Sequence, residues 1–145
     1  MFKHILIPTD GSELATQAVD KGLAFAAQIG AAVTVLTVTE PFRILSSDAM
    51  QVESTRASYD GDATAHAERI LKTARDKAAA AGVPVQTHHK WHESPYESII
   101  DTALAEGCDL IAMASHGRRG MAAVLMGSQA TKILTHSKIP VLVYR

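Results

Sequence analysis

The strongest constraint on the fold is a unit that recurs along the chain: a segment with helical spacing of apolar residues, a glycine, and then a short apolar run rich in β-branched residues. A glycine in this place favours the left-handed conformation that ends many helices. The unit therefore predicts helices that alternate with strands. It occurs three times, at residues 15–38, 67–85 and 96–113, with its glycine at Gly30, Gly82 and Gly107.

Both ends of the chain extend this pattern. Ile5-Leu6-Ile7 precedes the first helical segment, and Val141-Leu142-Val143 follows a short helical segment around 130–134. Runs this apolar are typical of strands buried on both faces, in a parallel sheet with helices on each side and right-handed crossovers. We expect one domain over residues 1–145, of the doubly wound α/β class.

The composition limits which binding partners, and which cellular compartment, we expect for the protein. The 145 residues are 47% hydrophobic, enough for one sizeable core, and the net charge of −1 creates no field that would attract nucleic acid or a membrane surface. Cys108 is the only cysteine, so no intrachain disulfide can form, which fits a reducing compartment. No apolar run approaches the length of a membrane span, and the amino terminus lacks a signal-peptide pattern. We expect a cytoplasmic protein.

One stretch does not follow the pattern. Residues 40–62 are polar, lack a clear period, and are longer than a normal connection between elements. We interpret them as a mobile cover or a segment that contacts a partner.

The first candidate ligand segment is Pro8-Thr9-Asp10-Gly11-Ser12, which follows the first strand. In open parallel sheets, ligands bind beyond the carboxyl ends of the strands, where the winding reverses. Asp10 is either a turn residue that bonds local amides or a carboxylate that holds ribose hydroxyls. Ser12 is expected to cap the helix that follows.

The second candidate segment follows the run at 110–113 and includes Ala114–Gly120 and then Gly127-Ser128-Gln129. Glycines let a backbone approach a ligand, and amides at a helix start attract phosphate. Arg118 or Arg119 could supply a cation. The alternative is a flexible loop in which Ser128 is an ordinary helix cap. A Walker lysine and a Gly-x-Gly-x-x-Gly turn are both absent, so a nucleotide site here would be of another kind.

These motifs resemble those of the universal stress protein family, of its ATP-binding type, over Lys3 to Tyr144. The resemblance rests on the opening Ile7–Ser12, on Gly117 followed by nine residues and then Gly127-Ser128, and on the closing Ile139–Val143. It implies a five-stranded parallel sheet in the order 3-2-1-4-5, like that of the adenine nucleotide alpha-hydrolases. It also implies a homodimer. We expect this dimer to form through the C-terminal strand, because Val141–Tyr144 is an apolar run that would lie at a sheet edge.

The resemblance implies a role for each matching position. Asp10 holds the ribose, and the adenine is flanked by Pro8, Thr9 and Val38. The residues that line the ribose and first phosphate are Met113, Ala114, Ser115, His116 and Gly117, and those that take the remaining phosphates are Arg118, Gly127, Ser128 and Gln129. The chain departs from the family pattern at two places: Ala114 replaces a glycine, and Glu93-Ser94-Pro95 replaces Gly-x-Pro.

Other chemistry finds less support in the sequence. His88, His89 and His92 could suggest a metal, but neighbouring strand residues point to opposite faces and no four-ligand zinc pattern is present. We predict neither a metal site nor a catalytic residue, because no nucleophile has an evident base to orient and activate it.

Three functions therefore stay open. The favoured one is a regulatory or stress-response module that binds ATP or a related adenine nucleotide, with or without Mg²⁺. The others are a slow ATP hydrolase that uses the same pocket and a dimeric interaction module without a nucleotide.

Overall fold

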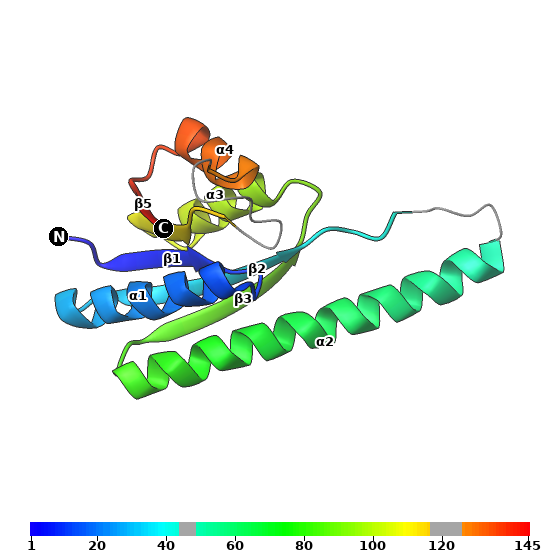
Figure 1. Ribbon diagram of the computed structural model, residues 1–145, viewed down its shortest axis with the longest axis horizontal. Coiled ribbons are helices and arrows are strands. Elements are labelled where there is room, and N and C mark those ends of the chain that lie inside the picture. The colour runs from blue at the N-terminus through cyan, green and yellow to red at the C-terminus, as the bar shows by residue number, and fades with distance from the viewer. Residues whose placement is uncertain (44–48, 117–125) are drawn as a thin grey trace.

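The computed structural model describes residues 1–43, 49–116 and 126–145. Its core is one parallel sheet of five strands in the order β3-β2-β1-β4-β5 (Figure 1). The strands are β1 (His4–Pro8), β2 (Ala32–Thr39), β3 (Val85–Trp91), β4 (Leu110–Ala114) and β5 (Val141–Tyr144). The helices are α1 (Glu13–Ile29), α2 (Ala49–Ala81), α3 (Pro95–Ala105) and α4 (Ser128–His136). The doubly wound class and the strand order are thus confirmed.

Helices cover both faces of the sheet, with α1 and α2 on one side and α3 and α4 on the other (Figure 1). Alternate residues of β1 pack against the helices on opposite faces of the sheet. Ile5 and Ile7 pack into the cluster under α1 and α2, whereas Leu6 packs into the cluster under α3 and α4. All three side chains are fully buried, which is why the strand reads as a continuous apolar run.

The three glycines that end helical segments share one geometry. Gly30, Gly82 and Gly107 have φ angles of 71°, 70° and 70°, in the left-handed region. In each case the next residue donates its N–H to the carbonyl five positions before it, closing the last turn of the helix. These bonds are Ala31 to Ala26 at 2.9 Å, Val83 to Ala78 at 2.9 Å and Cys108 to Ala103 at 2.8 Å. The predicted unit of helix, glycine and strand is confirmed.

The starts of β1 and β4 are joined by one carboxylate. Asp109 accepts hydrogen bonds from the N–H groups of Lys3, at 2.9 Å, and His4, at 3.0 Å. Burial alone would raise the pKa of Asp109, but these backbone donors hold the pKa below its ordinary value. The two strands are therefore held in register at their amino ends.

Helix α2 is longer than the sequence pattern predicted. The interpretation of residues 40–62 as a connection is wrong from Ala49 onward, where the helix begins; residues 44–48 lie outside the described part. Side chains from 53 to 58 are all exposed, so this part carries no apolar stripe. It contains no proline and continues the amphipathic helix at 67–81. Extending a helix that has already formed costs much less free energy than starting a new one.

This first part of α2 extends beyond the sheet (Figure 1) and makes an aromatic contact with the rest of the protein through Tyr59. The Tyr59 ring lies 5.5 Å from that of Phe42 and 6.4 Å from that of Trp91, between ring centroids. Its hydroxyl donates to the carbonyl of Glu40 at 2.7 Å. These contacts attach the exposed part of α2 to the ends of β2 and β3.

Two glycines test the helical assignment of residue 61. A Cβ at Gly61 or at Gly30 would meet nothing within 4 Å, so both sites have room for a side chain. The two sites differ only in backbone conformation, because φ is positive at Gly30. Gly61→Ala should raise the free energy of unfolding by roughly 0.5–1 kcal/mol, because alanine favours a helix. Gly30→Ala should lower it by roughly 1 kcal/mol, because φ is positive there. Urea denaturation followed by circular dichroism measures both, and a Gly61→Ala protein no more stable than wild type would contradict the helix at 61.

Candidate functional site

The candidate site lies where β1 and β4 separate. β1 stays paired with β2 as far as Pro8, and β4 stays paired with β5 as far as Ala114. Between β1 and β4, however, the register that the structure gives for the described residues ends at Leu6 with Ile111. The carboxyl ends of the two central strands thus follow different neighbours, as they do at the switch point where doubly wound sheets bind ligands.

The turn after β1 is fixed by its own hydrogen bonds. The N–H of Thr9 donates to the carbonyl of Leu36 at 2.9 Å, and the Thr9 hydroxyl oxygen accepts from the N–H of Gly11 at 3.2 Å. Oδ1 of Asp10 accepts from the N–H of Ser12 at 2.9 Å. Asp10 therefore has the turn role that the sequence left open, and since a carboxylate has lone pairs on both oxygens, this bond is compatible with a ligand bond.

Ser12 caps α1 as predicted. Its side-chain oxygen accepts from the N–H of Ala15 at 3.2 Å. The turn and the helix start thus form one hydrogen-bonded unit at the carboxyl end of β1.

After β4 the chain places a serine and a histidine side by side in the interior. Ser115 and His116 are buried, and the Ser115 Oγ lies 3.1 Å from Nδ1 of His116. The other ring nitrogen of His116, Nε2, is also buried and meets no hydrogen-bond partner among the described residues. A ligand at this edge that bonded Nε2 would remove the cost of about 1–3 kcal/mol that a buried polar atom without a partner carries.

The start of α4 is held directly against the end of β4. The N–H of Gly127 donates to the carbonyl of Ser115 at 2.8 Å. A Cβ on Gly127 would lie 3.2 Å from that carbonyl oxygen and 3.5 Å from the Cα of His116, so glycine allows the close approach. Gly127 is the N-cap and Ser128 the first helical residue, so the interpretation of Ser128 as an ordinary helix cap is wrong. The first amides of α4 are left to face this edge with partial positive charge.

Gln129 has a structural contact that the sequence did not reveal. Its side-chain Oε1 accepts from the N–H of Tyr96 at 3.0 Å, at the start of α3. Ser94, the N-cap of α3, makes no side-chain capping bond, so Gln129 satisfies an amide that would otherwise lack a partner. The two residues are far apart in sequence, and no local pattern relates them.

The remaining predicted residues lie as follows. Val38 of β2 packs against the cluster on the α3 and α4 side, and Met113 and Ala114 form the buried end of β4. Pro8 ends β1. Gly117 and Arg118 lie outside the described residues, as does Arg119.

Glu93 is exposed and follows β3, the edge strand. Because β2 separates β3 from β1, about 10 Å separates the axes of β3 and β1.

The neighbouring histidines of β3 serve different contacts. Nε2 of His88 lies 3.1 Å from Oε1 of Glu106, whereas Nε2 of His89 lies 2.7 Å from the hydroxyl of Thr39. Burial lowers the pKa of His89, with Glu68 opposing this effect. Among the residues that the structure describes, no three His, Cys, Asp or Glu side chains are grouped so as to hold a metal.

The sheet order and the switch point define a doubly wound α/β protein. A model of the universal stress protein family matches residues 1–145. The chain belongs to the universal stress protein family.

Three relatives illustrate the similarity. The Thermus aquaticus protein described as a universal stress protein in the QAH/OAS sulfhydrylase 3′ region is 30% identical over 145 residues, the full length of both chains. The structure of protein MJ0577 of Methanocaldococcus jannaschii matches with a TM-score of 0.82 and 29% identity, covering 99% of this chain and 95% of the other. A universal stress protein solved in complex with cAMP matches with a TM-score of 0.73 and 26% identity, covering 99% and 97%.

Within the described ranges, no helix has both the length and the hydropathy that crossing a membrane requires.

Cys108 is buried just before β4, and burial raises the pKa of its thiol to about 11. A hydrogen bond with Thr34 opposes this shift, and the charges of Glu106 and Asp109 add to it. Because the thiolate is the reactive form, this environment argues against a reactive-thiol role.

We therefore expect Cys108 to alkylate slowly in the folded protein. With a pKa of about 11, about one thiol in a thousand is ionised at pH 8, against about a quarter at the ordinary pKa near 8.5. Iodoacetamide at pH 8 should react about two hundred-fold more slowly with native than with urea-unfolded protein. The native rate should rise about ten-fold per pH unit between pH 7 and 9. Equal rates in the two states would show that the thiol is neither protected nor perturbed.

Proposed function

We propose that this universal stress protein binds ATP or a related adenine nucleotide where β1 and β4 separate, and acts as a regulatory or stress-response module. The observation that carries the proposal is the start of α4, held against the end of β4 by the bond between Gly127 and Ser115. Its first amides have no side-chain cap and belong to the helix start next to the point at which β1 and β4 separate. Backbone amides at a helix start are a common phosphate site. The related universal stress protein in complex with cAMP supports an adenine nucleotide as the ligand.

The proposed arrangement divides the nucleotide between the two central strands. The adenine lies by Pro8, Thr9 and Val38, and Asp10 accepts from the ribose hydroxyls. The first amides of α4, with the hydroxyl of Ser128, bind the outer phosphates. The first phosphate and the ribose are lined by Met113, Ala114, Ser115 and His116. Gly117, Arg118 and Gln129 complete the set that the family resemblance implies.

His116 suits a phosphate contact because of its pairing with Ser115. If the Ser115 hydroxyl donates to Nδ1 across their 3.1 Å separation, the neutral ring carries its proton on Nε2. That nitrogen is the buried one without a partner among the described residues. A phosphate oxygen would then accept a hydrogen bond from this N–H and remove the cost of the unsatisfied group.

Asp10→Asn separates the ribose role from the turn role. Asparagine keeps an Oδ1 that can accept from Ser12, so the fold should be retained, whereas the charged acceptor for the ribose is lost. Affinity for ATP in isothermal titration should fall about ten-fold, as for a hydrogen bond to a charged group. Asp101→Asn, on an exposed position of α3, is the matched control and should bind as wild type does. Equal affinity of Asp10→Asn and wild type would assign Asp10 to the turn alone.

We further propose that the protein forms a homodimer through β5. This strand lies at one edge of the sheet, and exposed strand edges tend to be paired or covered. The carbonyls of Pro140 and Tyr144 accept from β4, so the backbone groups of the residues between them alternate in direction. Val141 and Val143 accordingly present their N–H and C=O groups to the open edge.

A pair of substitutions at Val143 tests this edge. Val143→Pro removes an outward N–H while leaving the bonds to β4, since proline is tolerated on an edge strand with its nitrogen outward. Val143→Ala removes similar packing but keeps the N–H. Light scattering after gel filtration should report a dimer for wild type and Val143→Ala, and a shift toward monomer for Val143→Pro. A monomeric wild type at micromolar concentration, or a fully dimeric Val143→Pro, would refute pairing through β5.

A further inference from the structure

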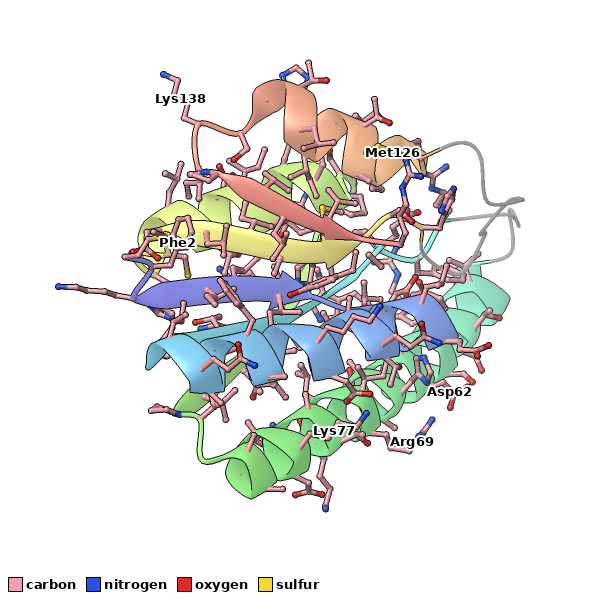
Figure 2. All side chains as sticks on the ribbon, turned by 60° about the vertical axis from the view of Figure 1, so that its left-hand side comes forward. Phe2, Asp62, Arg69, Lys77, Met126 and Lys138 are labelled. Atoms are coloured by element: carbon pink, nitrogen blue, oxygen red, sulfur yellow. The ribbon has the colours of Figure 1, made fainter. Side chains whose placement is uncertain are left out.

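A cavity of about 210 Å³ lies between α1 and α2, on the sheet face opposite α3 and α4. Its walls combine apolar side chains, among them Val19, Ile70 and Ala74, with the basic side chains Arg69 and Lys77. Arg69 and Lys77 lie along one side of α2, beside α1 (Figure 2). Among the described residues that line the cavity there is no carboxylate. The cavity is therefore mostly apolar, and of its two basic residues Lys77 is paired with Asp20 at 2.7 Å.

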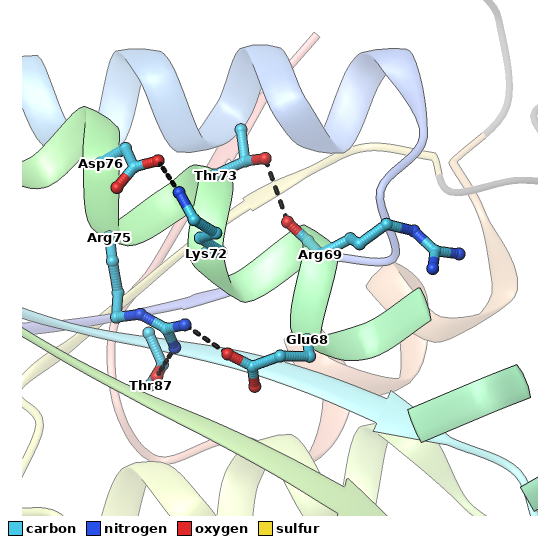
Figure 3. A network of polar contacts seen from close by, with 7 residues as sticks. All are labelled: Glu68, Arg69, Lys72, Thr73, Arg75, Asp76 and Thr87. Atoms are coloured by element: carbon cyan, nitrogen blue, oxygen red, sulfur yellow. Dashed lines mark hydrogen bonds and ion pairs between the residues drawn. The ribbon is translucent and has the colours of Figure 1, made fainter. Parts of the chain in front are cut away.

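Arg69 differs from the basic residues that follow it on α2. Lys72 pairs with Asp76 at 2.8 Å, Arg75 pairs with Glu68 and bonds Thr87, and Lys77 pairs with Asp20 at 2.7 Å. The Arg69 guanidinium has no ion pair or hydrogen bond to any residue that the structure describes. Figure 3 shows it extending away from this network, while only the backbone carbonyl of Arg69 takes part, accepting from the Thr73 hydroxyl at 3.0 Å.

The chemistry of this cavity matches an organic anion. A guanidinium binds a phosphate or carboxylate through two parallel hydrogen bonds, and it is more weakly hydrated than an ammonium. The apolar walls would cover a hydrocarbon group of the same molecule. The volume of about 210 Å³ corresponds to about seven water molecules at roughly 30 Å³ each, enough for a ring or a short branched chain. It is smaller than the usual 300–1,000 Å³ of drug-sized pockets, which favours a small ligand.

We propose that the cavity between α1 and α2 binds a small organic oxyanion, with Arg69 on the anionic group and Val19, Ile70 and Ala74 around the apolar group. This site adjoins the proposed nucleotide site at the edge between β1, β4 and α4, but its anion-binding side chain, Arg69, belongs to α2. The two meet at the turn after β1, because Thr9 and Gly11 also line the cavity. Binding here does not depend on whether the protein binds a nucleotide.

The test uses phenyl phosphate as the probe and ¹⁵N-labelled full-length protein without nucleotide. In a titration followed by amide chemical shifts, the signals of Gly11, Thr16 and Thr73 should move, since these residues line the cavity. Arg69→Gln should weaken binding about ten-fold or more, as for loss of a charged hydrogen bond. Lys72→Gln is the matched control, because Lys72 lies on the same helix with its charge paired to Asp76, and it should bind as wild type does. The spectra also report whether each variant is folded.

Three results would overturn the proposal, and a fourth would overturn the role of its apolar walls. The first is an Arg69→Gln protein that binds phenyl phosphate as tightly as wild type. The second is a set of shifts confined to Gly127 and Ser128, which would mean that the probe enters the proposed nucleotide site instead. The third is the absence of any shift at the cavity with millimolar probe. Inorganic phosphate provides the last comparison: it should bind more weakly than phenyl phosphate, and equal affinity would refute a role for the apolar walls.

Discussion

The candidate site depends on how β1 is held at its two ends. At the amino end, Asp109 binds the N–H groups of Lys3 and His4 and keeps β1 beside β4. At the carboxyl end, β1 follows β2 while β4 follows β5, and the register between β1 and β4 ends at Leu6 with Ile111. A parallel sheet wound in both directions from its centre has to separate somewhere along this line. The fixed amino end determines that the separation falls at the other end, where the polar turns are.

The close approach of α4 to β4 then decides what that separation can bind. Gly127 places the helix start on the Ser115 carbonyl, and the nearest contact of an added Cβ would be 3.2 Å. A larger residue would have to push this carbonyl or the backbone of His116 outward. The same glycine leaves no side chain to satisfy the first amides of α4, so their partial charge faces the edge of the sheet. The close packing and the uncapped amides at this edge thus have a single cause, Gly127.

Much of this could be predicted from the sequence, for reasons that particular residues make clear. The strands were found because Ile5, Leu6 and Ile7 are buried on both faces, and the helix ends because glycines such as Gly30 adopt positive φ. The first part of α2 was missed because an apolar period reports burial, and that part of the helix is exposed. The contact of Gln129 with Tyr96 could not be found, since it joins two helices that only the tertiary fold brings together. The cavity beside Arg69 was missed for the same reason.

The turn after β1 is rigid, and this rigidity affects both the proposed nucleotide site and the cavity between α1 and α2. Thr9 is buried and donates its N–H to Leu36, its carbonyl accepts from the hydroxyl of Thr37 at 2.9 Å, and its side chain accepts from Gly11. Gly11 in turn leaves room for Ile70, whose Cδ1 would lie 2.8 Å from an added Cβ. Because these bonds fix the turn before any ligand arrives, a ligand on either side loses little free energy to ordering it. Because the turn is fixed and Gly11 lies this close to Ile70, a side chain at position 11 would have to displace Ile70.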